Sequence, residues 1–265
     1  MPIHYEVDDH IALITFDRPE ARNAMDADHY NQLGDCWERA KRDRDVRVVV
    51  VTGVGDSFCA GADLKTFIPT IAERSANPDR EYESPLRHGA ATTLRDYDFF
   101  KPIVAAVNGY CVASGMEMLL GMDIRIASER ASFGLPEVRW GLFASGGSTV
   151  RLPRQIPFAP AMEILLTGER ISAQQALMWG LVNRVVPHET VLDEAMGVAR
   201  KIASNSPFAV SETKRSAVRG LGLGMKDAYA LESEIGQGVF GAPDAQEGPR
   251  AFAERREPNW PSARR

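Results

Sequence analysis

The chain has 265 residues, 44% of them hydrophobic and 25% charged, which is enough for one large domain with a buried core. Its formal net charge of −5 argues against a nucleic-acid-binding protein that works through a general positive field. No stretch approaches the ~18 apolar residues of a membrane span, and the first residues contain no signal-like apolar segment. Three cysteines without metal-like spacing predict reduced thiols, so we expect a cytoplasmic protein.

The first half of the chain alternates strand-like and helix-like segments. Residues 3–7 and 11–16 flank a short polar turn and predict a hairpin. Between residues 27 and 42, apolar side chains recur at intervals of three and four, which predicts an amphipathic helix. Residues 46–52 form a continuous β-branched run, typical of a strand buried on both faces. With two more short strands at "KPIVAAVNG" and "DIRIAS", separated by helices, this predicts a parallel sheet and an α/β core.

The last third of the chain is predicted to be helical. Ser172 and Gln175 fit a capping box that starts a helix ending before Gly180. Further helices are expected over about 206–219, 225–240 and 244–256. In contrast, residues 66–88 are rich in proline, serine and charge, so we expect a mobile loop near a site there rather than a domain linker.

Two turns of very small residues each follow a buried strand, at "FCAGADL" and at "CVASGMEM". In an α/β sheet such turns lie at the carboxyl ends of strands, where ligands bind. Two helix N-termini with free N–H groups would make a hole for an anion. Small residues also permit close packing of helices on a sheet. For either turn alone, close packing and a functional site are equally good interpretations. The two turns together favour a functional site.

Two glutamates stand among apolar neighbours. Glu117 lies in "SGMEMLLG" and Glu137 in "FGLPEVRWG". Most glutamates are simply solvated at the surface. A carboxylate in an apolar segment is costly without partners, and these two lie close in sequence to the second turn and the strand after it. We therefore treat both as candidate acid–base residues.

Several motifs together resemble the enoyl-CoA hydratase/isomerase (crotonase) superfamily. They are "FDRPEARNAMD", "FCAGADL", "KPIVAAVNGYCVASGMEM", "DIRIASERASFGLPEVRWGL", "GGSTVRL" and "LTGERISAQQALMWGLVNRVVP". The resemblance covers nearly the whole chain and rests on the order and spacing of the motifs. It implies an α/β crotonase fold of repeated ββα units with a helical C-terminal region. It further implies an acyl-CoA site in residues 1–200, trimerisation through residues 201–265, and a homotrimer or a dimer of trimers.

The resemblance also assigns roles to the site residues. The backbone N–H groups of Ala62 and Ser114 would hold the thioester oxygen of an acyl-CoA as it becomes an enolate. Ser114 stands where the family usually has glycine, so its hydroxyl either crowds the thioester or adds a donor. Glu117 is assigned mainly to the water and Glu137 to the α-carbon proton, although the pair could share both tasks.

Coenzyme A is expected to be carried as part of the substrate, with no metal and no redox cofactor. Phe143 and Ala144 replace the "IP" or "VP" of many hydratases. Together with Trp140 and the loop over residues 66–88 they bear on the choice of acyl chain. Three cations are weaker candidates for binding the CoA phosphates, since most surface cations are only solvated. They are Lys214, Arg219 and Arg250. The residues that match CoA-binding positions are Arg22, Ala24, Ala60, Ala62, Asp63, Leu64 and Lys214.

The expected function is therefore that of an enoyl-CoA hydratase. The presence of both Glu117 and Glu137 favours hydration, because isomerases of the family commonly use one carboxylate. Isomerisation, decarboxylation and thioester hydrolysis on the same scaffold are the nearest alternatives, since fold does not settle chemistry. A non-catalytic CoA-binding subunit is an alternative of a different class.

Overall fold

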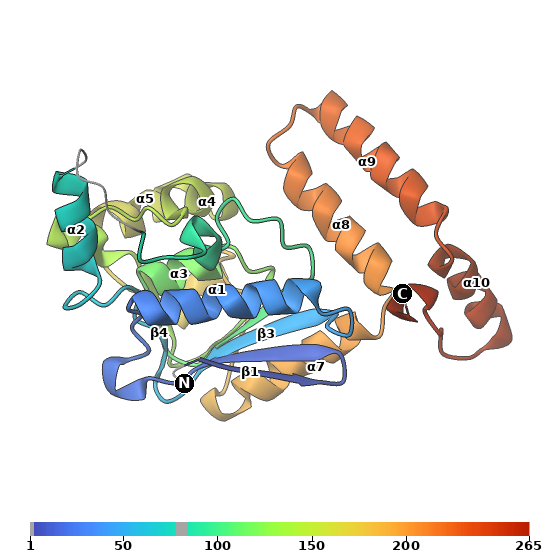
Figure 1. Ribbon diagram of the computed structural model, residues 1–265, viewed down its shortest axis with the longest axis horizontal. Helices are drawn as coiled ribbons and strands as arrows, with labels where there is room; N and C mark the ends of the chain where they lie inside the picture. The colour runs from blue at the N-terminus through green and yellow to red at the C-terminus, as the bar shows by residue number, and fades with distance from the viewer. Residues whose placement is uncertain (1–2, 78–83, 265) are drawn as a thin grey trace.

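A six-stranded sheet forms the centre of the fold in the computed structural model, which describes residues 3–77 and 84–264 (Figure 1). Its strand order is β1-β2-β3-β5-β7-β10, antiparallel between β1 and β2 and parallel elsewhere. The predicted hairpin is confirmed. The strands are β1 (Ile3–Asp8), β2 (Ile11–Phe16), β3 (Val48–Gly53), β5 (Ile103–Val107), β7 (Ile124–Ser128) and β10 (Arg184–Val186).

A second, four-stranded sheet has the order β4-β6-β8-β9. Three times the chain leaves a strand of the large sheet and continues into a strand of the small one, from β3 to β4, β5 to β6 and β7 to β8. The unit β5-β6-α3 shows the predicted ββα repeat most clearly. The strands of the small sheet are β4 (Ser57–Cys59), β6 (Tyr110–Val112), β8 (Ser132–Gly134) and β9 (Ile171–Ser172), and α3 is Ser114–Leu119.

Strand β3 is buried on both faces, as its run of valines predicts, although it starts at Val48 rather than at residue 46. Val48 and Val50 belong to an apolar cluster with helix α7 (Val191–Ala203). Val49 and Val51 belong to the larger core cluster on the other face, which includes residues of α1 and of the small sheet. Alternate side chains of a strand point to opposite faces, so a strand between two layers must be apolar throughout.

Local capping explains where several helices begin. Helix α1 spans Ala27–Arg42 as predicted, and the Asp26 carboxylate accepts a hydrogen bond from the His29 N–H at 3.1 Å. The predicted capping box of Ser172 and Gln175 is also confirmed, at the start of α6. The other helices of this part of the chain are α2 (Ile68–Ala76), α4 (Ser148–Gln155), α5 (Phe158–Thr167) and α6 (Ala173–Met178), with 3₁₀ turns at Pro19–Ala21, Gly89–Thr93, Pro136–Trp140 and His188–Thr190.

The expected loop over 66–88 is wrong for its first part, where α2 forms. Pro69 lies in the first turn of this helix, where the missing N–H costs nothing. Ile68 and Ile71 pack against the core from one side of α2. The pattern was masked by the polar residues around it, and residues 78–83 of the expected loop lie outside the described residues.

The C-terminal third is helical, as predicted. Helices α8 and α9 pack side by side and extend away from the sheet, and α10 follows at the far end of α9 (Figure 1). Ser206 caps α8 by accepting a hydrogen bond from the Ala209 N–H at 3.1 Å. The predicted division into residues 1–200 and 201–265 stays a prediction. Helix α7 packs on the large sheet as far as Ala203. The bounds are α8 (Pro207–Gly220), α9 (Met225–Phe240), α10 (Asp244–Glu254) and a last 3₁₀ turn at Pro261–Arg264.

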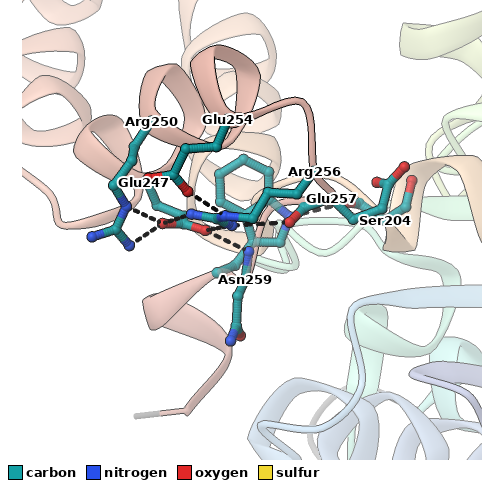
Figure 2. Close-up of polar contacts among 8 residues, drawn as sticks. Ser204, Glu247, Arg250, Glu254, Arg256, Glu257 and Asn259 are labelled. Atoms are coloured by element: carbon teal, nitrogen blue, oxygen red, sulfur yellow. Dashed lines mark hydrogen bonds and ion pairs between the residues drawn. The ribbon is translucent and has the colours of Figure 1, made fainter.

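A buried carboxylate organises the end of the chain (Figure 2). Glu247 on α10 is only 2% exposed and accepts hydrogen bonds from the Arg256 guanidinium at 2.6 Å and the Asn259 N–H at 2.8 Å. Arg250 pairs with the same carboxylate. These contacts fold the chain after α10 back toward α8. In the parts of the chain that the structure describes, no helix has the length and apolar character to cross a membrane.

Candidate active site

Three predicted site segments follow three neighbouring strands of the small sheet. Ala62 lies just after β4, Ser114 just after β6, and Glu137 just after β8. These strands are parallel, with β6 between the other two. The carboxyl ends of parallel strands meet at one edge of a sheet, so residues more than fifty positions apart in sequence come together.

The small residues let the two turns touch. Gly61 has a φ of +91°, and a Cβ added to it would lie 2.6 Å from the Ala113 Cβ and 3.0 Å from the Ser114 nitrogen. A Cβ added to Gly115 would lie 2.3 Å from the Cys59 carbonyl oxygen. Contacts that short do not occur, so both positions need glycine. Close packing of the two turns thus accounts for these glycines.

The N–H groups of Ala62 and Ser114 are not used by the local backbone pairing. The Met25 N–H donates to the Gly61 carbonyl at 2.8 Å, and the Asp63 N–H donates to the Met25 carbonyl at 2.7 Å, a bridge that bypasses the Ala62 N–H. Ser114 is the first residue of α3, where N–H groups have no partner inside the helix.

Both residues line a cavity of about 690 Å³, within the range of small-molecule sites. Its wall is largely apolar. Among the described residues, three charged side chains also line it: Arg95, Glu117 and Glu137. Among the apolar and aromatic lining residues are Tyr30, Leu64, Phe67, Ile71, Leu142 and Phe143.

Glu117 lies on α3, only 4% exposed, at the inner side of the cavity. Its Oε1 accepts a hydrogen bond from the Gly146 N–H at 2.5 Å. Burial raises the pKa of this carboxyl, while the Gly146 N–H and the Ser114 hydroxyl act against the rise by stabilising the charged form.

Glu137 lies in the 3₁₀ turn Pro136–Trp140 that follows β8. Burial, with a smaller contribution from the charge of Glu117, raises the pKa of Glu137 to about 7. Its Oε2 is buried without a hydrogen-bond partner among the described residues. A carboxyl group in such a place can carry a proton near neutral pH and deliver it to a molecule in the cavity.

The hydroxyl of Ser114, the departure from the family glycine, acts on two ionisable groups of the site, the Tyr30 phenol and the Glu117 carboxyl. It favours the charged form of each and so acts against the rise in pKa that burial causes in both. Tyr30 is held by its ring, which packs on Phe67 with centroids 4.8 Å apart. The serine therefore adds a polar group where α3 begins.

The expected CoA-binding residues near the two turns lie together. The Ala60 N–H donates to the Arg22 carbonyl at 3.0 Å, and Ala24 lies between Arg22 and the Met25–Ala62 bridge. The Arg22 guanidinium covers the ring of Tyr110, 5.1 Å from its centre. Leu64, 51% exposed, lies at the edge of the cavity.

Asp63 has structural contacts. Its Oδ1 accepts hydrogen bonds from the N–H groups of Lys65 and Thr66, and its Oδ2 pairs with Arg18 at 3.1 Å. Burial opposes ionisation of Asp63, but these contacts outweigh it and lower the pKa. The residue caps the turn after Ala62.

The structure does not bring Lys214 to this cavity. Its ammonium is 2.7 Å from the Asp123 carboxylate and donates to the Lys101 carbonyl at 3.0 Å. It lines a separate cavity of about 480 Å³ between α8 and the core. Arg219 pairs with Asp98 at 2.6 Å, and Arg250 with Glu247, so a role for these cations at the CoA phosphates stays a prediction.

Sequence reasoning missed Gly146, Tyr30 and Arg95. A Cβ on Gly146 would lie 2.4 Å from Glu117 Oε2, so this glycine is needed for the carboxylate to reach its place. The glycine pair in "GGSTVRL" is the sequence signal for this position. Nothing in the local sequence marks Tyr30 or Arg95, whose importance comes from the cavity that they share.

The fold brings two carboxyls and the ends of two small-residue turns to one cavity. The family model for enoyl-CoA hydratase/isomerase matches residues 6–263, and the chain belongs to this family. It is 41% identical over 251 residues to the enoyl-CoA hydratase EchA19 of Mycobacterium tuberculosis, covering 95% of this chain and 93% of the relative. It is 42% identical over 265 residues to the (E)-benzylidenesuccinyl-CoA hydratase of Thauera aromatica, covering 99% of this chain and all of the relative.

Solved structures agree on the fold. A structure described as a putative enoyl-CoA hydratase/isomerase from Mycobacterium abscessus superposes with a TM-score of 0.88 at 37% identity, covering 99% of this chain and 100% of the other. The expected crotonase fold is therefore confirmed.

Proposed function

We propose that the protein is an enoyl-CoA hydratase, which adds water across the α,β double bond of an acyl-CoA thioester. The observation that carries this proposal is the pair Glu117 and Glu137. Both carboxyls have raised pKa values and line one cavity with Ala62 and Ser114. The relatives named as hydratases, at 41% and 42% identity, support it.

In the proposed reaction the thioester oxygen accepts hydrogen bonds from the N–H groups of Ala62 and Ser114. Water adds to the β-carbon as Glu117 orients it and accepts its proton, and negative charge develops on the thioester oxygen. The enolate then takes a proton at the α-carbon from Glu137. Each N–H donor would contribute about 3 kcal/mol to the stability of the transition state, because it is fixed before charge develops.

Two carboxyls distinguish this proposal from isomerisation. An isomerase moves one proton between two carbons, for which one carboxyl suffices, whereas hydration must handle a water molecule and a carbon. The raised pKa of both groups supports the use of both. Loss of a conjugated enoyl thioester is followed by its ultraviolet absorbance, so a panel of short, long and branched enoyl-CoA substrates tests the assignment. Failure to hydrate any member while CoA still binds would defeat it.

For the CoA part of the substrate, we propose contacts with the segment that contains Arg22, Ala24 and Ala60 and with the turn from Ala62 to Leu64. Their position beside the proposed oxyanion hole supports this. We propose no metal and no redox cofactor, because the reaction described above uses only carboxyls and backbone donors.

We also propose a homotrimer, or a dimer of trimers, in the cytoplasm. Large apolar side chains stand exposed on the C-terminal helices, and burial against neighbouring subunits would remove them from water. The number three comes from the family resemblance, and closed symmetry is usual for such assemblies. Light scattering that shows a monomer at micromolar concentration would contradict the proposal. The most exposed large apolar side chains in this part of the chain are Leu221, just after α8, Phe240 and Phe252, at 86%, 84% and 86%.

A further inference from the structure

The wall of the catalytic cavity contains one cation. Among the described residues that line it, Arg95 is the only lysine, arginine or histidine, and the remainder of the wall is apolar apart from the two glutamates and a few small polar groups. The proposed hydration uses Arg95 only indirectly, through its hydrogen bond to the peptide that positions Glu117. A guanidinium beside an acyl pocket needs an explanation, because apolar acyl chains gain nothing from a charged neighbour.

The position of Arg95 is defined by the peptide between Ser145 and Gly146. Arg95 Nη1 donates to the Ser145 carbonyl at 2.6 Å, and the N–H at the other end of that peptide donates to Glu117 at 2.5 Å. Given the dimensions of a peptide group, Arg95 Nη1 lies no more than about 8 Å from the Glu117 carboxylate. The cation therefore lies on the same side of the cavity as one of the two proposed acid–base carboxyls.

Much of the guanidinium is free to bind a ligand. The side chain is 48% exposed, and arginine has five N–H donors in a planar fork. Among the described residues its ion-pair partner is Asp96, 3.4 Å away and 84% exposed. An exposed pair of that kind contributes little, so a carboxylate entering the cavity can take its place.

We propose that Arg95 binds a second carboxylate carried by the acyl group, so that the preferred substrates are enoyl-CoA thioesters of dicarboxylic acids. The inference rests on the proposed function and narrows it. The Glu117 carboxylate repels an anionic acyl group, and a cation close to it offsets that repulsion. Arginine also matches a carboxylate with two parallel hydrogen bonds, which would fix the orientation of the acyl chain.

Equilibrium binding tests this without requiring turnover. The ligands are succinyl-, glutaryl- and adipyl-CoA, which are saturated, and the terminal primary amide of each. Carboxylate and amide have nearly the same size, so their ratio of Kd values isolates the charge. We expect the wild-type protein to bind one of the carboxylates ~10- to 100-fold more tightly than its amide, the usual effect of a charge-assisted bidentate contact.

Variants assign the preference to a residue. Arg95→Gln should abolish it and Arg95→Lys should keep part of it, with Arg42→Gln, an exposed arginine at the end of α1, as the matched control. Arg95 also contacts the peptide that positions Glu117, but displacement of Glu117 would move a negative charge away and favour the carboxylate, so it cannot explain a lost preference for the carboxylate. Equal affinity of the wild type for carboxylate and amide at all three lengths would overturn the proposal, as would a preference that survives Arg95→Gln. Because hydration is measured separately on neutral enoyl-CoA substrates, failure of the proposed function would be seen on its own.

Discussion

Gly146 and Glu117 are in contact through the backbone of one and the side chain of the other. The Gly146 N–H donates to Glu117 Oε1 at 2.5 Å, and a Cβ at residue 146 would lie 2.4 Å from Glu117 Oε2. The glycine therefore both binds the carboxylate and leaves room for it. Since Glu117 comes from α3 and Gly146 from the segment before α4, this one contact joins two parts of the site.

Replacing Gly146 by alanine should move Glu117. The added methyl group occupies the place of the carboxylate, so we expect hydration to fall by ~10²-fold or more, as when a positioned acid or base is displaced. Gly197→Ala on α7 is the matched control, since a Cβ there meets nothing within 4 Å. Full activity of Gly146→Ala would show that Glu117 does not act in the position described.

Substituting either glutamate by glutamine should lower hydration by ~10²- to 10⁴-fold while folding and CoA binding survive. The double variant should lose much less activity than the product of the single losses, because the two residues act together on one water molecule and one carbon. Ultraviolet assays of the two single variants and the double variant measure this. If Glu117→Gln leaves turnover unchanged while Glu137→Gln removes it, the two-carboxyl mechanism is wrong and an isomerase-like use of one carboxyl is favoured.

The raised pKa of Glu137 predicts a pH dependence of activity. Glu137 must be protonated to deliver a proton to the α-carbon, and burial raises its pKa to about 7. We therefore expect kcat/KM to fall on the alkaline side with a midpoint near this value. A pH–rate profile of wild type measures it, and a flat profile through neutral pH would contradict the role of Glu137 as the acid.

The same shift predicts an effect on stability. Between the ordinary value of 4.5 and about 7, the folded protein holds a proton on Glu137 that the unfolded chain releases, so the free energy of unfolding falls as pH rises. Glu137→Gln removes this loss and should be more stable than wild type above neutral pH, by up to about 3 kcal/mol. Urea unfolding at a series of pH values measures the difference. Glu6→Gln, at an exposed position, should show none.

Ser114→Gly and Ser114→Ala should both keep substantial activity, because the proposed oxyanion contact uses the backbone N–H. The hydroxyl, however, lowers the pKa of Glu117, so its loss should move the acid limb of the pH–rate profile to higher pH. Kinetics of both variants across pH separate the two effects. A loss of ~10²-fold or more in both would assign the hydroxyl a direct role.

The sequence by itself determined those helices and strands that depend on neighbouring residues only. The hairpin at the start, the helix over Ala27–Arg42 and the capping box at Ser172 follow from alternation, period and capping, and the motifs in order indicated the family. Helix α2 was missed because its short apolar pattern is interrupted by polar and proline residues, and its packing on the cavity decides its conformation.

Only the tertiary structure decided which residues share the cavity. Ala62, Ser114 and Glu137 meet because β4, β6 and β8 are parallel neighbours, and strand order depends on the packing of the whole chain. Arg95 lines the same cavity, where it donates a hydrogen bond to the carbonyl of Ser145, fifty residues later in the chain. Such contacts leave no periodic signal in the sequence. The pattern of residue types predicts the local helix or strand, but it does not predict which distant segment packs against it.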